Sequence, residues 1–231
     1  MLVDQDGNPV VLPAHVPWSY SALTKFEKCP RSYGEVNVKK NYKFENNPVL
    51  DAGNATHQQL DNFVTSGAEL PILLRRIGDF VTKLSAKAKE VYPERQINLT
   101  HELKPCTVFH DYCVLRVKID LTLIYGATAI VLDYKTSSEP RETFEQLELS
   151  AAAVMIERPD IKEVNAAYVY TKHPVRQMKP IKQEQAADII KSYIPRLKRL
   201  EHARSNDDYP PKPGWWCKWC NVTRCEFYGK K

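Results

Sequence analysis

The sequence predicts a mixed α/β fold, in which helices flank a central mixed sheet and a C-terminal cysteine-rich metal module follows it. Two neighbouring apolar segments in the middle of the chain alternate as β-strands do. Amphipathic helical segments precede and follow them, and three cysteines stand close together near the C-terminus. The 231 residues, 43% of them hydrophobic, suffice for one domain with a real core and an appendage.

Local signals give the order of the elements. Leu2 to Leu12 alternates around a turn sequence and indicates a small hairpin. Ser19 or Ser21 is expected to cap a short helix that ends near Pro30. The other expected elements are helices over 52–64 and 70–91, strands over 97–104, 112–125 and 128–135, a helix over 141–156, a strand over 164–171 and a helix over 183–204.

The two central strands bring charged residues together. In the first strand the odd positions are apolar: Leu115, Val117, Ile119, Leu121 and Leu123. Asp120 therefore lies on the opposite face, with Arg116 and Lys118. In the second strand Asp133 and Lys135 share a face. If the two strands form a hairpin, two carboxylates and an ammonium group converge at one edge of the sheet.

That group of side chains suits metal-assisted hydrolysis of phosphodiesters. Mg²⁺ binds one or two carboxylates together with water and phosphate oxygens, and a bound ion lowers the pKa of its water. A nearby lysine can stabilise the charge that develops on the phosphoryl oxygens. A solvated ion pair between Asp133 and Lys135 at a strand end is an equally good interpretation of these residues alone.

The segment LRVKIDLTLIYGATAIVLDYKTS resembles the core of the PD-(D/E)XK (restriction-endonuclease-like) nuclease superfamily, in its RecB-like branch. Asp120 and Asp133 match the two carboxylates of that family and Lys135 matches its lysine, whereas Lys118 stands where a glycine is usual. The expected order of helix, three strands, helix and strand is also that of the family core.

Two flanking patterns extend the resemblance. Gly53 and His57 reproduce a Gly-x-x-x-His helix, and Gln146 matches the glutamine of a Gln-x-x-x-Tyr helix in which Ser150 replaces the tyrosine. The resemblance implies that His57, Asp120 and Asp133 bind a catalytic Mg²⁺ or Mn²⁺, with Lys135 and Gln146 as further catalytic residues. Without the resemblance, a histidine beside an apolar helix stripe is more often a core residue than a ligand.

Three cysteines at the C-terminal end have metal-ligand spacing: Cys217, Cys220 and Cys225. With Cys29 before Pro30, they resemble iron–sulfur nucleases of the same branch, of the AddB and CRISPR-adaptation types. The resemblance implies a structural [4Fe–4S] cluster held by these four thiolates. On spacing alone, zinc is an equal candidate. Disulfides are not expected, since no signal peptide is expected and the spacing is that of metal ligands.

The predicted domains are an N-terminal extension over 1–18, a nuclease core over 19–205, and a proline-rich linker with the cysteine-rich tail over 206–231. A net charge of +5 permits a nucleic-acid channel without requiring one. No apolar run is long enough to span a membrane. The protein is expected to lie in the cytoplasm, and an infected host cell is among the cells considered.

The resemblance implies a metal-dependent DNA nuclease, an exonuclease acting on ends or single strands. By analogy it would work with recombination, repair or replication proteins, or in phage or CRISPR processing. The alternative is a DNA-binding or assembly subunit whose nuclease site is vestigial.

Three further features have a structural and a functional interpretation. Glu102 is either an accessory carboxylate or an exposed strand residue. The basic residues of the last helix, such as Arg196, either contact DNA or form a solvated face. The tail aromatics either stack bases or pack around the metal module: Trp215, Trp216, Trp219, Phe227 and Tyr228.

Overall fold

The computed structural model describes residues 2–4, 6–13, 17–43, 48–137, 143–172 and 176–230. Within these ranges, one five-stranded sheet has the strand order β1-β2-β3-β4-β5. Only β3 and β4 run parallel; the other neighbouring strands are antiparallel. The elements are α1 (Tyr20–Lys28), α2 (Pro30–Tyr33), η1 (Gly34–Val38), α3 (Pro48–Ser66), α4 (Arg75–Ser85), β1 (Glu90–Thr100), β2 (Cys113–Ile124), β3 (Thr128–Lys135), α5 (Glu145–Glu157), β4 (Glu163–Tyr170), β5 (Arg176–Lys182), η2 (Gln183–Gln185), α6 (Ala186–Ser205) and η3 (Trp215–Trp219).

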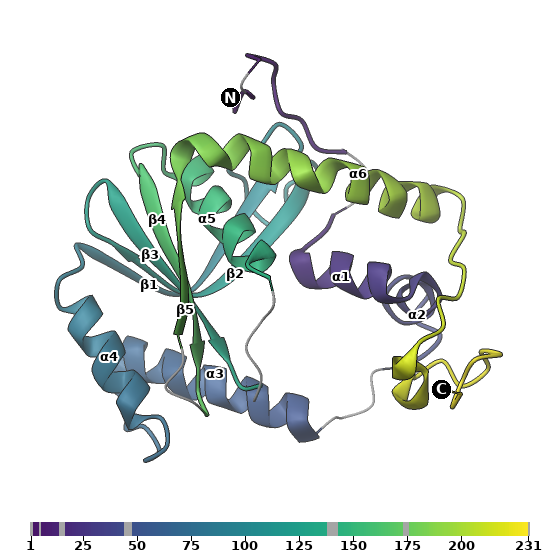
Figure 1. Ribbon diagram of the computed structural model, residues 1–231, viewed down its shortest axis with the longest axis horizontal. Helices are drawn as coiled ribbons and strands as arrows, with labels where there is room; N and C mark the ends of the chain where they lie inside the picture. Colours follow the sequence, from purple (N-terminus) through teal and green to yellow (C-terminus); the bar gives the residue numbers. More distant parts are fainter. Residues whose placement is uncertain are drawn as a thin grey trace.

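Helices cover both faces of the sheet, which confirms the predicted fold class (Figure 1). α5 and α6 lie on one face, and α3 and α4 lie on the other. The core is divided accordingly. One buried cluster includes Leu147 of α5 and Leu197 of α6, and a second includes Leu60 of α3 and Val81 of α4.

β2 changes its buried face next to Asp120. Ile119 belongs to the α5–α6 cluster, whereas Leu121 belongs to the α3–α4 cluster. Residues two apart share a face in a regular strand. The pairing of β1 with β2 is interrupted at this point, since Pro93 pairs with Leu121 and Arg95 with Ile119, whereas Glu94 between them has a φ of 46°. The predicted alternation of β2 is therefore right on each side of Asp120 and wrong across it.

Several element boundaries differ from the prediction. The predicted helix over 70–91 is too long at both ends, since α4 covers only Arg75–Ser85 and β1 already begins at Glu90. β1 is longer than expected because it pairs with β2 along nearly its whole length. The sequence gives no signal for β5, an edge strand that contains Pro180.

The N-terminal parts of the prediction have mixed outcomes. The expected hairpin is reduced to a single bridge between Val3 and Pro9. The N-cap prediction is confirmed, since Ser19 Oγ accepts a hydrogen bond from the Ala22 N–H at 3.3 Å. The expected start of a helix at Arg141 lies outside the described residues.

Candidate active site

A cleft of about 690 Å³ opens between the sheet and the N-terminal half of α3. It is lined by all five residues that the sequence singles out as catalytic: His57, Asp120, Asp133, Lys135 and Gln146. They come from α3, β2, β3 and α5. Residues separated by up to 89 positions in the sequence therefore meet at one surface.

The hairpin of β2 and β3 positions the two aspartates. Main-chain pairing runs from Leu121–Leu132 back to the turn, where Gly126 has a φ of 98°. Beyond Leu132 the strands part, and the Tyr134 N–H donates to Asp120 Oδ2 at 2.7 Å. The Asp120 side chain thus takes the place of a main-chain acceptor, which fixes it beside the end of β3.

Asp133, Lys135 and Gln146 form a small network. Gln146 Nε2 donates to Asp133 Oδ1 at 2.7 Å, and Lys135 Nζ donates to Gln146 Oε1 at 3.0 Å. Lys135 Nζ also forms an ion pair with Asp133 Oδ2. Gln146 lies in the first turn of α5, so this helix links the lysine to the aspartate.

Asp133 is only 8% exposed. Burial raises the pKa of its carboxyl group to about 6, although the charge of Lys135 opposes the shift. Among the described residues, its buried Oδ2 atom has the ammonium group of Lys135 as its ion-pair partner and accepts no other hydrogen bond. A buried carboxylate oxygen in this condition fits the chemistry of a cation ligand.

His57 faces Asp120 from α3. Its Nδ1 atom lies 3.1 Å from Asp120 Oδ1, and this hydrogen bond raises the pKa of His57 while burial opposes the rise. Gly53, one turn earlier, explains how α3 comes so close. A Cβ atom at this position would lie 3.3 Å from Thr136 Oγ1, just after β3, so glycine relieves a tight contact.

Glu94 is the residue that the sequence analysis missed. Ligand atoms of His57, Glu94 and Asp120 all lie within 4.8 Å of one another, and Glu94 also forms an ion pair with Lys118. Lys118 is the residue that departs from the usual glycine. Only the register of β1 against β2 places Glu94 here, and no sequence pattern marks it.

Glu102, the accessory carboxylate that the sequence suggested, lies elsewhere. It is an exposed turn residue whose Oε2 atom pairs with Lys104 Nζ at 2.6 Å, and it does not line the cleft. For Arg196 of α6, the contacts favour a structural role over contact with DNA. This guanidinium binds Glu27 at 2.7 Å through two nitrogens, and Glu145 at 3.0 Å.

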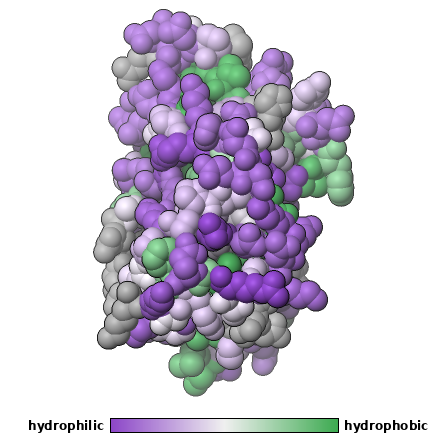
Figure 2. All heavy atoms as spheres, turned by 90° about the vertical axis from the view of Figure 1, so that its right-hand side faces the viewer, coloured by the Kyte–Doolittle hydropathy of each residue, from purple (hydrophilic) through white to green (hydrophobic). Residues whose placement is uncertain are grey.

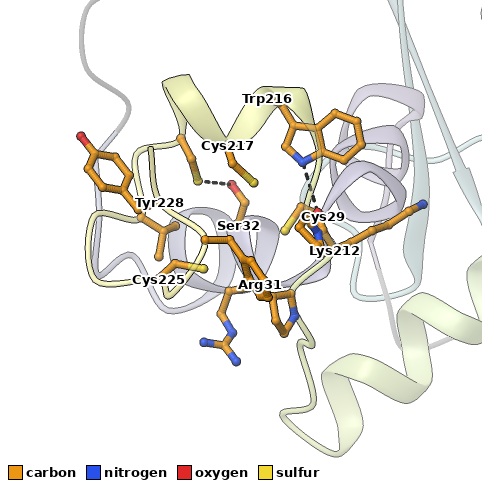
Figure 3. A pocket seen from close by; sticks show the side chains of 13 residues that line it. Cys29, Arg31, Ser32, Lys212, Trp216, Cys217, Cys225 and Tyr228 are labelled. Carbon is orange, nitrogen blue, oxygen red and sulfur yellow. Dashed lines mark hydrogen bonds between the residues drawn. The ribbon is translucent and has the colours of Figure 1, made fainter. Parts of the chain in front are cut away.

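A second cavity brings together the four cysteines that the sequence groups: Cys29, Cys217, Cys220 and Cys225. It lies between the α1–α2 junction and the C-terminal tail (Figure 3). All four are free thiols, and the Gly214 N–H points at Cys217 Sγ at 3.5 Å. Arg31 ties the linker to α2, since its Nε donates to Tyr209 O at 3.0 Å.

The four thiols are suitable ligands for a metal group. The distances between their sulfur atoms bear on which group they could hold. Within the described chain, no three of these thiols lie within 4.8 Å of one another. Zinc–sulfur bonds of about 2.3 Å would place tetrahedral sulfurs about 3.8 Å apart. As placed, the thiols are wider apart than the ligands of one zinc ion. The free space between them is about 10 Å³, so a larger group would need the side chains to turn outward.

A histidine, carboxylates and a lysine at one cleft of a mixed sheet are typical of metal-dependent phosphodiester hydrolases. The model of the PD-(D/E)XK nuclease superfamily matches residues 17–225. The chain therefore belongs to the PD-(D/E)XK nuclease superfamily, a group of nucleases that use divalent metals.

Two of the solved structures that are similar to this chain illustrate the match. The crystal structure of SSO0001 has a TM-score of 0.50 and 16% identity, and the match covers 94% of this chain and 89% of that one. The protein named Putative exonuclease from Eubacterium rectale has a TM-score of 0.46 and 13% identity, with 91% and 86% covered. No curated protein matches the chain. None of the helices in the described ranges is long and apolar enough to cross a membrane.

Proposed function

We propose that this chain is a DNA nuclease of the RecB-like branch that uses Mg²⁺ or Mn²⁺ and degrades DNA as an exonuclease. The observation that carries the proposal is the buried carboxylate of Asp133, which is paired with Lys135 at a cleft shared with His57 and Asp120. An oxygen-binding cation would satisfy this carboxylate and offset its burial.

The residues of the chain divide the work between binding and chemistry. His57, Asp120 and Asp133 would hold the ion. Glu94 would join them, since its carboxylate groups with His57 and Asp120 within 4.8 Å, whereas Asp133 lines the same cleft outside that group. When bound, the ion supplies a more acidic water and neutralises charge on the phosphate. Lys135 then orients the attacking water and stabilises the phosphoryl oxygens, while Gln146 keeps its ammonium group in place.

The tail would hold a structural metal group, for which the [4Fe–4S] cluster is our first choice and zinc the second. Four thiols on one cavity supply donors for either group, and the resemblance of Cys29 and the tail to iron–sulfur nucleases favours the cluster. Such a group would join Cys29 to the tail, linking distant parts of the chain. Its role is stability, because metal binding in a small module is also folding energy.

Cleavage of labelled DNA tests the proposal. Linear single-stranded and double-stranded DNA should be degraded in Mg²⁺ or Mn²⁺, and both should survive in EDTA. Closed circular DNA of the same sequences should persist, because an exonuclease requires a free end. Degradation of circles would show an endonuclease instead.

An assembly subunit with a vestigial site is the competing function. It would bind DNA in this assay without shortening it in any divalent metal. Partners from recombination, repair or replication belong to either function, and co-purification with the tagged full chain would identify them.

A further inference from the structure

The C-terminal tail exposes two tryptophans that the cysteine cavity does not use. Trp215 is 66% exposed and Trp219 is 71% exposed, and both lie on η3. Trp216, between them, has a structural role. It lines the cysteine cavity, and its Nε1 donates to Lys212 O at 3.2 Å (Figure 3). Its ring also covers Gly214, where a Cβ atom would be 2.5 Å away.

The two exposed indoles form a pair. Their ring centroids are 5.8 Å apart and their planes are inclined by 74°. Trp219 also lines a hollow of about 220 Å³ between η3 and the helices α1 and α2. Asn37 and Asn221 add amide groups to this hollow, which can form hydrogen bonds with the edge of a base.

The surroundings of the pair are positively charged. Lys28 Nζ lies 5.1 Å from the ring centroid of Trp215, and Lys218 Nζ lies 5.9 Å from that of Trp219. The described residues that line the hollow include Lys25 and Lys28 and no acidic side chain. The molecular face that carries the tail is mostly hydrophilic (Figure 2). Exposed aromatic rings beside ammonium groups fit a ligand with both flat bases and phosphates.

The tail contacts a residue that is close in sequence to the active-site cleft. Asn221 Nδ2 donates to Lys43 O at 3.1 Å, and Val49 lines the active-site cleft. Lys43 and Val49 are six positions apart in the sequence, so their Cα atoms are at most roughly 20 Å apart. A strand bound at the tail therefore has a short way to the cleft.

We propose that Trp215, Trp219 and Lys28 form a docking platform for an unpaired nucleic-acid strand. Bases stack on the indoles, and phosphates approach the lysines. This inference rests on the proposed nuclease function and adds to it a preference for single strands, because a duplex keeps its bases stacked inside and offers the indoles no free face.

Binding measured by fluorescence anisotropy in EDTA tests the platform without depending on hydrolysis. The full chain, with its metal group in place, is titrated into labelled dT20, rU20 and a 20-base-pair duplex. The double variant Trp215→Ala/Trp219→Ala should bind dT20 about tenfold to a hundredfold more weakly, since each stacked base contributes measurably. Duplex binding should change less than about twofold. The rU20 measurement distinguishes a DNA platform from one that accepts any single strand.

Matched variants separate binding from folding. Trp215→Phe/Trp219→Phe keeps flat rings and should retain most of the affinity for dT20. Phe109→Ala removes an aromatic side chain that is 92% exposed outside the tail and should change nothing. Lys28→Ala should reduce the salt dependence of dT20 binding by about 0.7 in log–log slope.

Three results would overturn the platform. The first is dT20 binding by the double alanine variant as tight as that of the parent. The second is an equal loss of duplex and single-strand affinity. The third is a parent that binds neither strand and instead dimerises through the tail. Absence of cleavage with platform binding intact would count against the nuclease proposal alone.

Discussion

The active-site cleft and the cysteine cavity are built on opposite principles. In the cleft, strands and long helices hold each functional side chain, and the chain supplies its own partners, such as Asp120 for His57 and Gln146 for Asp133. The cysteine cavity lies between the α1–α2 junction, the linker and the short η3, and its four thiols form no disulfide.

This difference separates geometry that packing creates from geometry that a bound group must complete. Sheet pairing and two buried clusters support the cleft and bring its side chains together. The tail has little apolar core of its own, with Cys217 and Val222 as its buried residues after Tyr209 among those described. Small modules of this kind depend on metals for stability.

Lys135→Ala should give the largest effect, which is a loss of cleavage at the cleft with no change at the cysteine cavity. Cleavage should fall at least about 10³-fold, because the ammonium group acts mainly on the transition state. DNA affinity should change only a few-fold. Steady-state kinetics and anisotropy measure the two quantities. Lys83→Ala, an exposed lysine of α4, is the control and should cleave normally. Parental cleavage by the Lys135 variant would show that the chemistry lies elsewhere.

Cys29→Ala should remove the metal group and destabilise the tail, while the chemistry at the cleft stays intact. The loss of one ligand should lower the melting temperature by about 5–15 °C, corresponding to several kcal/mol in a chain of this size. Anaerobically purified parent should absorb broadly near 400 nm if iron is bound, and the variant should lose that band; colourless parent with one zinc would favour zinc. Cys106→Ala, outside the cavity, should keep metal content and stability. An unchanged Cys29 variant would remove this residue from the metal site.

Glu94→Gln sharpens the description of the cleft. If Glu94 joins His57 and Asp120 around the ion, Mn²⁺ affinity should fall about tenfold to a hundredfold, as for other residues that support a metal. Isothermal titration calorimetry or electron paramagnetic resonance of Mn²⁺ gives the affinity directly. Glu102→Gln, which lies outside the cleft, should bind Mn²⁺ as the parent does. Equal affinities in both variants would leave Glu94 as a partner of Lys118 only.

The smallest effect concerns pH and the metal-free cleft. The pKa of His57 is raised by its hydrogen bond to Asp120, so the folded state binds the proton more tightly than the unfolded state. This stabilisation is complete below the unfolded pKa of about 6.5 and is lost as pH rises through the higher folded pKa. In EDTA, the melting temperature of the parent should exceed that of His57→Gln by a few degrees at pH 5.5, and the difference should shrink toward pH 9. A melting-temperature difference that stays constant from pH 5.5 to pH 9 would contradict this prediction.

Much of the cleft could be predicted because its residues lie on strongly patterned segments. Period-2 alternation identified β2 and β3, and a two-residue turn made them a hairpin. The hairpin brings Asp120 near Asp133, and Asp133 shares a face with Lys135. The roles of these residues as metal ligands and catalysts remain predictions, as does the role of the four cysteines.

The sequence by itself determined the fold class and the hairpin that brings Asp120 near Asp133, because periodicity and turn chemistry are local properties. The family resemblance, and not periodicity, added His57 and Gln146. Only the tertiary structure decided the register of β1, which brings Glu94 to His57. It also decided the pairing of β5, an edge strand whose Pro180 is unfavourable to a strand prediction. It also decided which tail tryptophans are exposed: Trp216 packs on Gly214, whereas Trp215 and Trp219 face solvent. Register and exposure depend on contacts between segments distant in sequence, and local patterns carry no information about them.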